Sequence, residues 1–450
     1  NDYRRFNYTP YAYRTKDYGT TWSRIVDEND VKSYTLSIVE DPMNANLLFL
    51  GTDDGLYISL NAGNQWMKWT AGFPTVSTKD LVIQPREHDL VIGTFGRAAW
   101  VLDDIRPLRA MANGNVLTKN LQLFAPPTAY QAAYQQPTGS RFGGDALFNG
   151  ENKRSGAMIS YYINRPAAAK EEKKEKETAR KKKRKGTKKM EAPIVKKELA
   201  SEVKFDSIKL EIFEGARLIR TLHQKAPKEN GIHRIYWSMN EKGADRPSRK
   251  IRKRTNEPRG VSVKPGTYNL KMSFGDQTSE SSIKVEFDPR LEMSTEAITE
   301  IYNASKDMEK DQQLMADVVK QLVESKNTAT AFKKDLTKED KKNYKDQIKA
   351  SKDIITKIDK LIAVYIGSVD KRQGITRNPE VTVSRRYSSA RRYVGSRFGH
   401  LTTTEKQLIS QYKKALETAI SQTNAFFETD WKTYKTTLET IRISPFKEVQ

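Results

Sequence analysis

The chain has 450 residues, of which 37% are hydrophobic, 9% aromatic and 30% charged, and its formal net charge is +23. This aromatic content excludes a chain that is disordered throughout. Cys is absent, which excludes disulfides, thiolate nucleophiles and Cys-ligated metal sites. No stretch approaches the roughly 20 consecutive apolar residues that a membrane-spanning helix needs.

The N-terminal end shows no targeting signal. The chain begins at Asn1, and no charged segment followed by an apolar segment comes after it. We therefore expect either a processed chain or a piece of a longer protein. Its length suggests about three domains of roughly 150 residues each.

Two segments near the N-terminus, residues 15–22 and 59–66, share the pattern Ser/Thr-x-Asx-x-Gly-x-x-Trp. The Asx side chain can close a turn, the Gly permits a positive φ there, and the Trp can pack between neighbouring sheets. The two Trp lie 44 residues apart, a period that fits one four-stranded propeller blade. The structural positions of the two boxes are Asp17, Gly19, Trp22, Asn61, Gly63 and Trp66.

Short apolar runs around these boxes predict strands. They are bounded by tight turns rich in Gly and Asp, such as residues 51–55. The predicted strands span residues 47–50, 56–60, 80–83, 90–92 and 98–102.

The repeated pattern resembles the Asp-box of sialidase, xyloglucanase and sortilin-type propellers. Residues 51–57 and 93–104 resemble the last blades of bacterial sortilin-like proteins, which are often catalogued as glycosyl hydrolases with Asp-box (BNR-type) repeats. Phe95 stands where that family usually has His. The resemblance implies that residues 1–106 are the C-terminal blades of a β-propeller. Since a closed propeller needs at least four blades, the others would come from an upstream segment or another chain.

The middle of the chain combines a linker with a second group of strands. Residues 107–150 read as linker, and period-two alternation within residues 151–290 predicts an antiparallel β-sandwich with a basic insertion at 166–200. The sortilin-like family has an Ig-like domain in this place, so the resemblance implies that fold. Trp237 is expected in the sandwich core, with a sugar platform as the alternative. The predicted strands are 157–163, 207–213, 217–222, 231–237, 266–272 and 281–287.

Residues 291–450 carry apolar stripes at spacings of three and four, which predict an antiparallel helical bundle. Ser294 is expected to cap the first helix, and Thr337 to start a second. Thr404 and Gln407 are expected to form a capping box for a third helix. The whole chain is therefore expected to be multidomain and mainly β, with an α C-terminal part.

The positive charge is concentrated in three runs, residues 170–189, 245–259 and 371–400, with net charges of +8, +5 and +7. The first run is expected to be a solvated loop, with an anionic partner as the alternative. The third run interleaves Arg with aromatics, which either anchor the segment on the bundle or bind an anionic ligand. The candidates for such a partner are Arg385, Arg386, Arg391, Arg392, Tyr387 and Tyr393.

No catalytic motif is found in the sequence. The four His show no spacing typical of a metal site, and no nucleophile elbow, P-loop or dinucleotide fingerprint is present. The adjacent pairs Asp53–Asp54 and Asp103–Asp104 point to opposite faces of a strand and do not suit a glycosidase. We therefore predict no catalytic residue, no metal site and no cofactor.

Three functions stay open. The favoured one is a non-enzymatic, exported envelope protein that binds a peptide or protein through a sortilin-like propeller, as scaffold or accessory subunit of a larger complex. The resemblance implies a periplasmic, outer-membrane-associated or secreted location. The first alternative is a glycoside hydrolase or carbohydrate-binding protein whose carboxylates lie in upstream blades. The second is a binder of anionic polymer through basic loops; a nucleic acid is not the expected polymer, because the spacing fits no known module.

Overall fold

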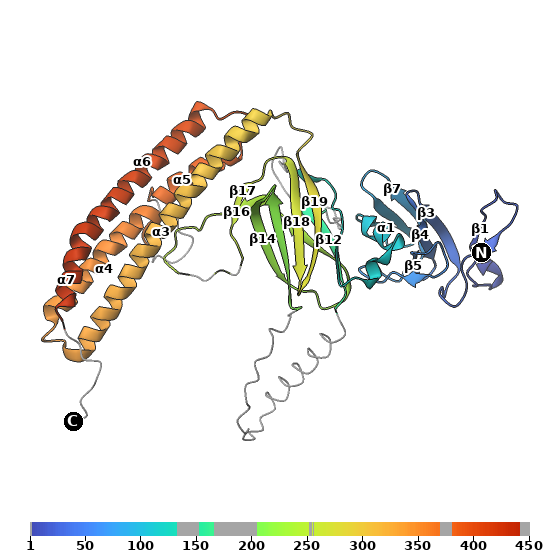
Figure 1. Ribbon diagram of the computed structural model, residues 1–450, viewed down its shortest axis with the longest axis horizontal. Helices are drawn as coiled ribbons and strands as arrows, with labels where there is room; N and C mark the ends of the chain where they lie inside the picture. The colour runs from blue at the N-terminus through green and yellow to red at the C-terminus, as the bar shows by residue number, and fades with distance from the viewer. Residues whose placement is uncertain are drawn as a thin grey trace, which may run out of the picture. The chain divides into compact units, whose positions relative to one another are not determined.

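The computed structural model describes residues 2–132, 153–165, 205–251, 254, 256–369 and 380–441. The chain divides into two compact units. The first comprises Asn1–Ser238 with Pro265–Glu286, and the second comprises Met239–Lys264 with Phe287–Gln450. Sheets dominate the first unit and long helices the second, which confirms a multidomain fold with β-sheets and a C-terminal helical part (Figure 1). With 36% helix and 30% strand the fold is mixed, so the prediction that it is mainly β is wrong, because the C-terminal helices are long. The predicted basic insertion at 166–200 lies outside the described residues.

The N-terminal part of the first unit contains two larger antiparallel sheets and one small one. A 3-10 helix precedes them, η1 (Tyr3–Arg5). The strands of the small sheet are β1 (Tyr13–Arg14) and β2 (Ser23–Arg24). The four-stranded sheet contains β3 (Thr35–Asp41), β4 (Asn44–Thr52), β5 (Gly55–Ser59) and β6 (Met67–Lys68). The three-stranded sheet contains β7 (Thr78–Gln84), β8 (Asp89–Thr94) and β9 (Ala99–Leu102). Strands are thus present at all five predicted places.

Strand β4 is buried on both faces. Leu47 and Phe49 belong to the core shared with the three-stranded sheet, whereas Leu48 and Leu50 belong to a second core. Successive side chains of a strand point to opposite faces, so a layer must cover each side of this sheet. The uninterrupted apolar run of β4 follows from this double burial.

The described residues cover only one face of the three-stranded sheet β7–β9. Its inner face contributes Leu81, Leu90 and Ile92 to the shared core. On the other face, Val82 of β7 is paired with Val91 of β8, and Val91 is paired with Val101 of β9. Val82 and Val101 are each 55% exposed. The register therefore aligns a row of three valines on the outer face of this sheet.

The rest of the first unit consists of two further sheets. They follow α1 (Arg106–Ala112) and the 3-10 helix η2 (Asn115–Thr118). The three-stranded sheet has the order β10 (Leu121–Leu123), β12 (Ala157–Ile163) and β15 (Gly231–Trp237). The five-stranded sheet has the order β11 (Ala129–Gln131), β19 (Gln277–Phe287), β18 (Gly266–Phe274), β13 (Ser207–Glu214) and β14 (Arg217–Lys225). Figure 1 labels β14, β18 and β19 of this sheet.

The stretch 107–150 differs from the expected linker in its described part. Strand β10 pairs with β12, and β11 pairs with β19 in the five-stranded sheet. Residues up to 132 thus contribute an edge strand to each sheet, because their short apolar segments complete the two hydrogen-bond ladders. Residues 133–150 lie outside the described residues.

The two sheets share a core around Trp237. This indole is fully buried, and its ring meets Tyr268 of the other sheet edge-to-face at a centroid distance of 5.5 Å. Tyr161 is also fully buried and accepts a hydrogen bond from Gln224 Nε2 at 2.8 Å. Trp237 is therefore a core residue, as expected, and is not exposed as a sugar platform would be.

The second unit contains a hairpin and long helices. The hairpin strands are β16 (Asn240–Lys242) and β17 (Arg259–Ser262). The helices are α3 (Thr295–Asp340), α4 (Lys345–Ile366), α5 (Val383–Gly395) and α6 (Thr403–Phe426), and a π-helical turn η3 (Phe427–Trp431) connects α6 to α7 (Lys432–Glu439). Only residues 341–344 join α3 to α4, so these two neighbours run in opposite directions (Figure 1).

Three local expectations for the helices can be compared with the structure. Ser294 caps α3, accepting from the Ala297 N–H at 3.2 Å, as predicted. The predicted helix start at Thr337 is wrong, because α3 continues through it. Leu336 is fully buried in the helical core, and Thr337 Oγ1 bonds back to the Lys333 carbonyl at 2.6 Å. Packing of Leu336 thus outweighs the local capping signal.

The capping box of α6 lies two residues before the predicted one. Thr402 and Glu405 form it, with the Thr402 N–H donating to Glu405 Oε2 at 2.8 Å, whereas Thr404 and Gln407 lie inside the helix. A carboxylate accepts main-chain N–H groups more strongly than an amide, and its charge is favourable at a helix N-terminus. Both pairs have the spacing of a capping box, so the charge of Glu405 decides between them.

Candidate functional site

The first Asp-box closes a turn through its own side chains. Asp17 Oδ1 accepts from the Thr21 N–H at 2.8 Å, and Asp17 Oδ2 accepts from Thr21 Oγ1 at 2.6 Å. The Gly19 N–H donates to Thr15 Oγ1 at 2.8 Å, and Gly19 has φ +95°, which favours glycine. Hydrogen bonds from the Thr21 hydroxyl, the Thr21 N–H and Thr15 lower the pKa of Asp17 to about 2. Asp17 therefore stays ionised and holds the turn.

The second box repeats this geometry with different chemistry. Asn61 Oδ1 accepts from the Gln65 N–H at 2.9 Å, and the Gly63 N–H donates to Ser59 Oγ at 2.9 Å. Asn61 Nδ2 also donates to Gln65 Oε1 at 3.2 Å. The replacement of Asp by Asn and of Thr by Gln thus keeps the oxygen that closes the turn.

The two box indoles have different surroundings. Trp66 is 6% exposed, packs in the core of Val26, Val31 and β4, and donates from Nε1 to the Ile25 carbonyl at 2.7 Å. Trp22 is 60% exposed, and its Nε1 donates to the carbonyl of Gly19 in its own box at 3.1 Å. Residues 25–31 therefore cover the second indole, and no described residue buries the first in the same way.

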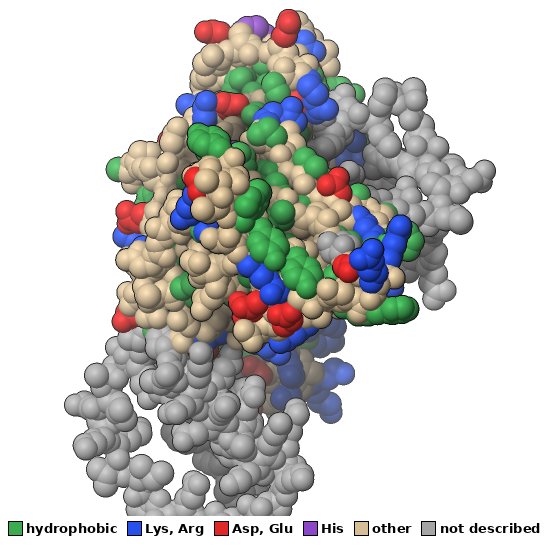
Figure 2. Space-filling view, turned by 90° about the vertical axis from the view of Figure 1, so that its right-hand side faces the viewer, with side chains coloured by type: hydrophobic (Ala, Val, Ile, Leu, Met, Phe, Trp, Pro, Cys, Tyr) green, Lys and Arg blue, Asp and Glu red, His purple; other side chains and the backbone are tan. Residues whose placement is uncertain are grey.

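The exposure of Trp22 belongs to a wider aromatic surface. Five more aromatic side chains of the N-terminal segment are exposed: Tyr3, Phe6, Tyr8, Tyr13 and Tyr18. Figure 2 faces the N-terminal end and shows hydrophobic side chains gathered in the middle of that surface, with Lys, Arg, Asp and Glu around them. An apolar patch with a polar rim is typical of a surface that contacts another protein.

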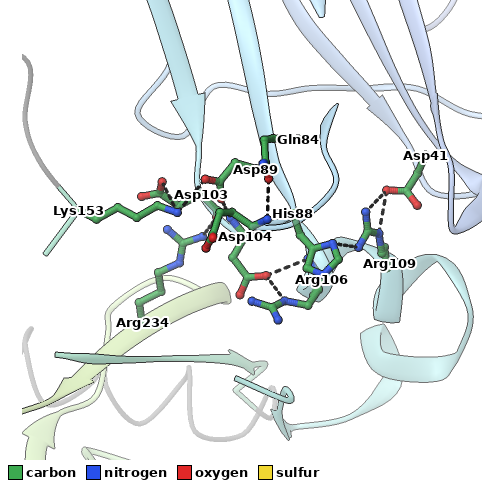
Figure 3. A network of polar contacts seen from close by, with 11 residues as sticks. Asp41, Gln84, His88, Asp89, Asp103, Asp104, Arg106, Arg109, Lys153 and Arg234 are labelled. Carbon is green, nitrogen blue, oxygen red and sulfur yellow. Dashed lines mark hydrogen bonds and ion pairs between the residues drawn. The ribbon is translucent and has the colours of Figure 1, made fainter. Parts of the chain in front are cut away.

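A polar network connects the three-stranded sheet β7–β9 to the sheets that follow it (Figure 3). Lys153 Nζ pairs with Asp89 at 2.7 Å and with Asp103 at 3.7 Å. Arg234 of β15 donates to the Asp103 carbonyl. Asp104 pairs with Arg106 Nε at 2.5 Å. Asp103 thus joins the two parts of the first unit through its carboxylate and its main-chain carbonyl, whereas the Asp104 carboxylate makes a local pair with Arg106.

The same network continues into α1. Arg109 Nε donates to Asp41 Oδ2 at 2.7 Å, and both side chains are buried. His88 Nδ1 lies 2.8 Å from Arg109 Nη1. Since a guanidinium only donates, His88 Nδ1 accepts, and the imidazole is neutral. Burial, followed by the charges of Arg106 and Arg109, lowers the pKa of His88, in agreement with this assignment.

The other adjacent carboxylate pair is also engaged. Asp54 Oδ2 pairs with Lys68 Nζ at 2.7 Å and accepts from the Tyr57 hydroxyl at 3.3 Å, while Asp53 is exposed. Phe95, at the position where the sortilin-like family has His, is 73% exposed and lies below Lys79 Nζ at 5.6 Å from the ring centroid. These contacts hold turns together and do not place two carboxylates around a common space.

Helix α5 carries the six candidates for an anionic partner. Tyr387 is buried, packs edge-to-face on Tyr412 at 5.5 Å, and its pKa is raised by burial to about 12. It therefore anchors α5 on the bundle, one of the two alternatives left open for this segment. The remaining five side chains are exposed, namely Arg385, Arg386, Arg391, Arg392 and Tyr393.

The sequence reasoning missed two groups of residues. Arg109, Asp41 and His88 lie in three separate segments, and no local pattern marks them as neighbours. Arg246 lies beside α5, although the sequence showed it only as part of the second basic run. The sequence shows that a run is basic, but it does not show which of its side chains lie beside another segment of the fold.

Within residues 2–132, 153–165, 205–251, 254, 256–369 and 380–441, no group of three or more His, Asp or Glu could hold a metal ion. None of the described helices is long and apolar enough to cross a membrane.

Comparisons of this chain with protein-family models, with curated proteins and with solved structures found no match. The likeness to sortilin-like proteins therefore depends on the sequence motifs alone. The function that it implies is a proposal.

Proposed function

We propose that this protein is a non-enzymatic binding component, a scaffold or accessory subunit of a larger complex. Its N-terminal sheets are the last blades of an Asp-box propeller of the sortilin type. The box geometry supports this proposal, because the two boxes differ in sequence and yet close the same turn. Each turn is followed directly by a Trp, Trp22 or Trp66.

One observation carries the proposal. The four-stranded sheet β3–β6 is covered on both faces. In contrast, Trp22 is exposed, and so are Val82 and Val101 in the valine row of the sheet β7–β9. Trp66 shows how such an indole is covered by a neighbouring layer. An incomplete ring has two such open ends, and further blades from an upstream segment or another chain would cover both.

The proposed binding role agrees with the contacts of the acidic side chains in the described part of the first unit. Asp17, Asp54 and Asp104 are held by turn or ion-pair contacts. Groups engaged in this way stabilise structure and are poorly placed to act as acid or base. A peptide or protein is therefore the ligand that we propose, and the family resemblance puts the protein in the periplasm, at the outer membrane or outside the cell.

Site-specific crosslinking tests this proposal. The chain has no Cys, so Lys16→Cys provides a single thiol on the exposed surface near Trp22. A photoreactive crosslinker on this thiol, activated in the cells that make the protein, should capture a segment with a Ser/Thr-x-Asp-x-Gly box other than the two at residues 15–22 and 59–66. Mass spectrometry of the crosslinked peptide identifies that segment.

Lys360→Cys is the matched control, because it is also an exposed Lys but lies on α4 in the second unit. Adding Trp22→Ala to Lys16→Cys should abolish the crosslink. Captured peptides without a box, or a monodisperse chain without crosslinks, would contradict the proposal. Turnover of sialosides or β-glucans by the intact protein would favour a glycoside hydrolase instead.

A further inference from the structure

The helical unit contains a pocket of about 620 Å³. Four segments line it: the loop after β16, helix α3, the end of α4 and one face of α5. Apolar side chains in the wall include Met315 and Ile366, together with the buried Tyr387. The volume is in the range typical of sites for small molecules.

Three arginines line this pocket, Arg246 from the loop and Arg391 and Arg392 from α5. Among the residues that the structure describes, no acidic side chain lines it. In the described part of the chain, none of the three guanidinium groups forms an ion pair or a hydrogen bond. Three unneutralised cations at one cavity produce a positive potential that attracts an anion.

Two carboxylates whose charges act on Tyr387 have other partners. Glu309 pairs with Lys306 at 2.7 Å. Asp311 accepts from the Tyr412 hydroxyl at 2.8 Å and lies 3.9 Å from Lys413 Nζ. These contacts leave the charge of the arginines available for a ligand.

The pocket is also where two basic runs of the sequence meet. Positions 384, 387, 388, 391 and 392 of α5 follow spacings of three and four and all line the pocket. Ser388 adds a hydroxyl donor to this face, whereas the Ser384 hydroxyl donates to Met315 Sδ at 3.3 Å. Arg386 on the same helix does not line the pocket. The tertiary structure therefore divides the basic residues of α5 into a pocket face and a solvent face.

We propose that this pocket binds a small organic anion with a phosphate monoester head and a flat apolar body. Arginine forks match the oxygens of a phosphate in pairs, and a phosphate presents three strong acceptors. Met315, Ile366 and Tyr387 line the same cavity and offer apolar surface to the body of the ligand. This inference does not depend on the propeller proposal, because the pocket lies wholly in the second unit.

Calorimetric titration of the full chain with 1-naphthyl phosphate tests the proposal. Two further titrations use 1-naphthol, which has the body without the charge, and inorganic phosphate, which has the charge without the body. We expect 1-naphthyl phosphate to bind, inorganic phosphate to bind more weakly, and 1-naphthol to give no saturable heat. Equal binding of 1-naphthol, or no binding of 1-naphthyl phosphate, would overturn the proposal.

Matched variants locate the binding. Arg246→Gln and Arg391→Gln should each weaken 1-naphthyl phosphate binding about tenfold, because each removes a charge-assisted contact. Arg386→Gln removes the same charge from the solvent face of the same helix and should change the affinity less than about twofold. Equal weakening by all three variants indicates an extended anionic polymer on a diffuse basic surface and overturns the pocket. All three positions are exposed, and circular dichroism melting checks that the variants fold.

Discussion

Asp41 and Arg109 form a buried ion pair although 68 residues separate them in the chain. Arg109 lies in α1, which follows the three-stranded sheet β7–β9, and Asp41 is the last residue of β3 in the four-stranded sheet. His88 contacts the same guanidinium from the turn between β7 and β8. Through these two contacts, Arg109 connects α1 to the four-stranded sheet β3–β6 and to the three-stranded sheet β7–β9.

Asp41→Asn should be strongly destabilising. The substitution leaves the buried Arg109 guanidinium without its charge partner, and removal of one partner of a buried pair costs about 3–5 kcal/mol. Urea unfolding of the full chain, followed by tryptophan fluorescence, reports mainly on the first unit, which contains all the Trp residues except Trp431. Glu87→Gln is the control, because its pair with Arg86 is exposed and should contribute less than about 1 kcal/mol. Equal losses for both variants would refute a special role of Asp41.

The first unit should lose stability as the pH falls below neutral. Burial, with the charges of Arg106 and Arg109, lowers the pKa of His88 from its ordinary value of 6.5, while Asp104 and Asp41 act in the opposite direction. The unfolded chain therefore takes up this proton more readily than the folded chain. The free energy of unfolding should fall as the pH passes downward through 6.5 toward the lowered pKa.

His88→Asn isolates this effect. Asn offers an acceptor to Arg109, does not titrate, and tolerates the left-handed backbone of this position, where φ is +59°. Urea unfolding at several pH values between 8 and 5 should show a shallower slope for the variant than for the wild type. Parallel slopes would show that other groups cause the pH dependence.

Asn61→Ala should weaken the second box. Its side-chain oxygen closes the turn at Gln65, and loss of such a hydrogen bond costs about 1 kcal/mol. Asn61→Asp keeps that oxygen, as Asp17 does in the first box, and should cost less than about 0.5 kcal/mol. Thermal unfolding of both variants provides the comparison, and a larger loss for Asn61→Asp than for Asn61→Ala would contradict the turn-closing role.

Trp66→Ala should cost much more stability than Trp22→Ala. Trp66 is buried among Val26, Val31 and β4, and truncation of a buried aromatic costs about 3–5 kcal/mol. Trp22 is mostly exposed in this chain, so its loss should cost less than about 1 kcal/mol. Chemical unfolding of the purified chain measures both. Similar losses would mean that Trp22 is covered in solution.

Much of the local structure could be predicted from the sequence, because local patterns carry it. Short apolar runs locate β4 and β5, alternating apolar residues locate β13 and β18, and Ser294 marks the start of α3. The Asx and Gly of each box specify their turn within eight residues, so a change of Asp to Asn does not hide it. Local signals failed where two of them competed, at Thr337 and at the capping box of Thr402.

The candidate sites depend on contacts between segments that are distant in the chain. The two boxes are alike in sequence, yet only packing of residues 25–31 makes Trp66 a core residue and leaves Trp22 exposed. The charge runs were visible as composition, but only the packing of the helical unit brings Arg391 and Arg246 to one pocket and leaves Arg386 outside it. Hydrogen bonds between near neighbours decide turns and helix ends, whereas burial of apolar surface between remote segments decides which side chains meet.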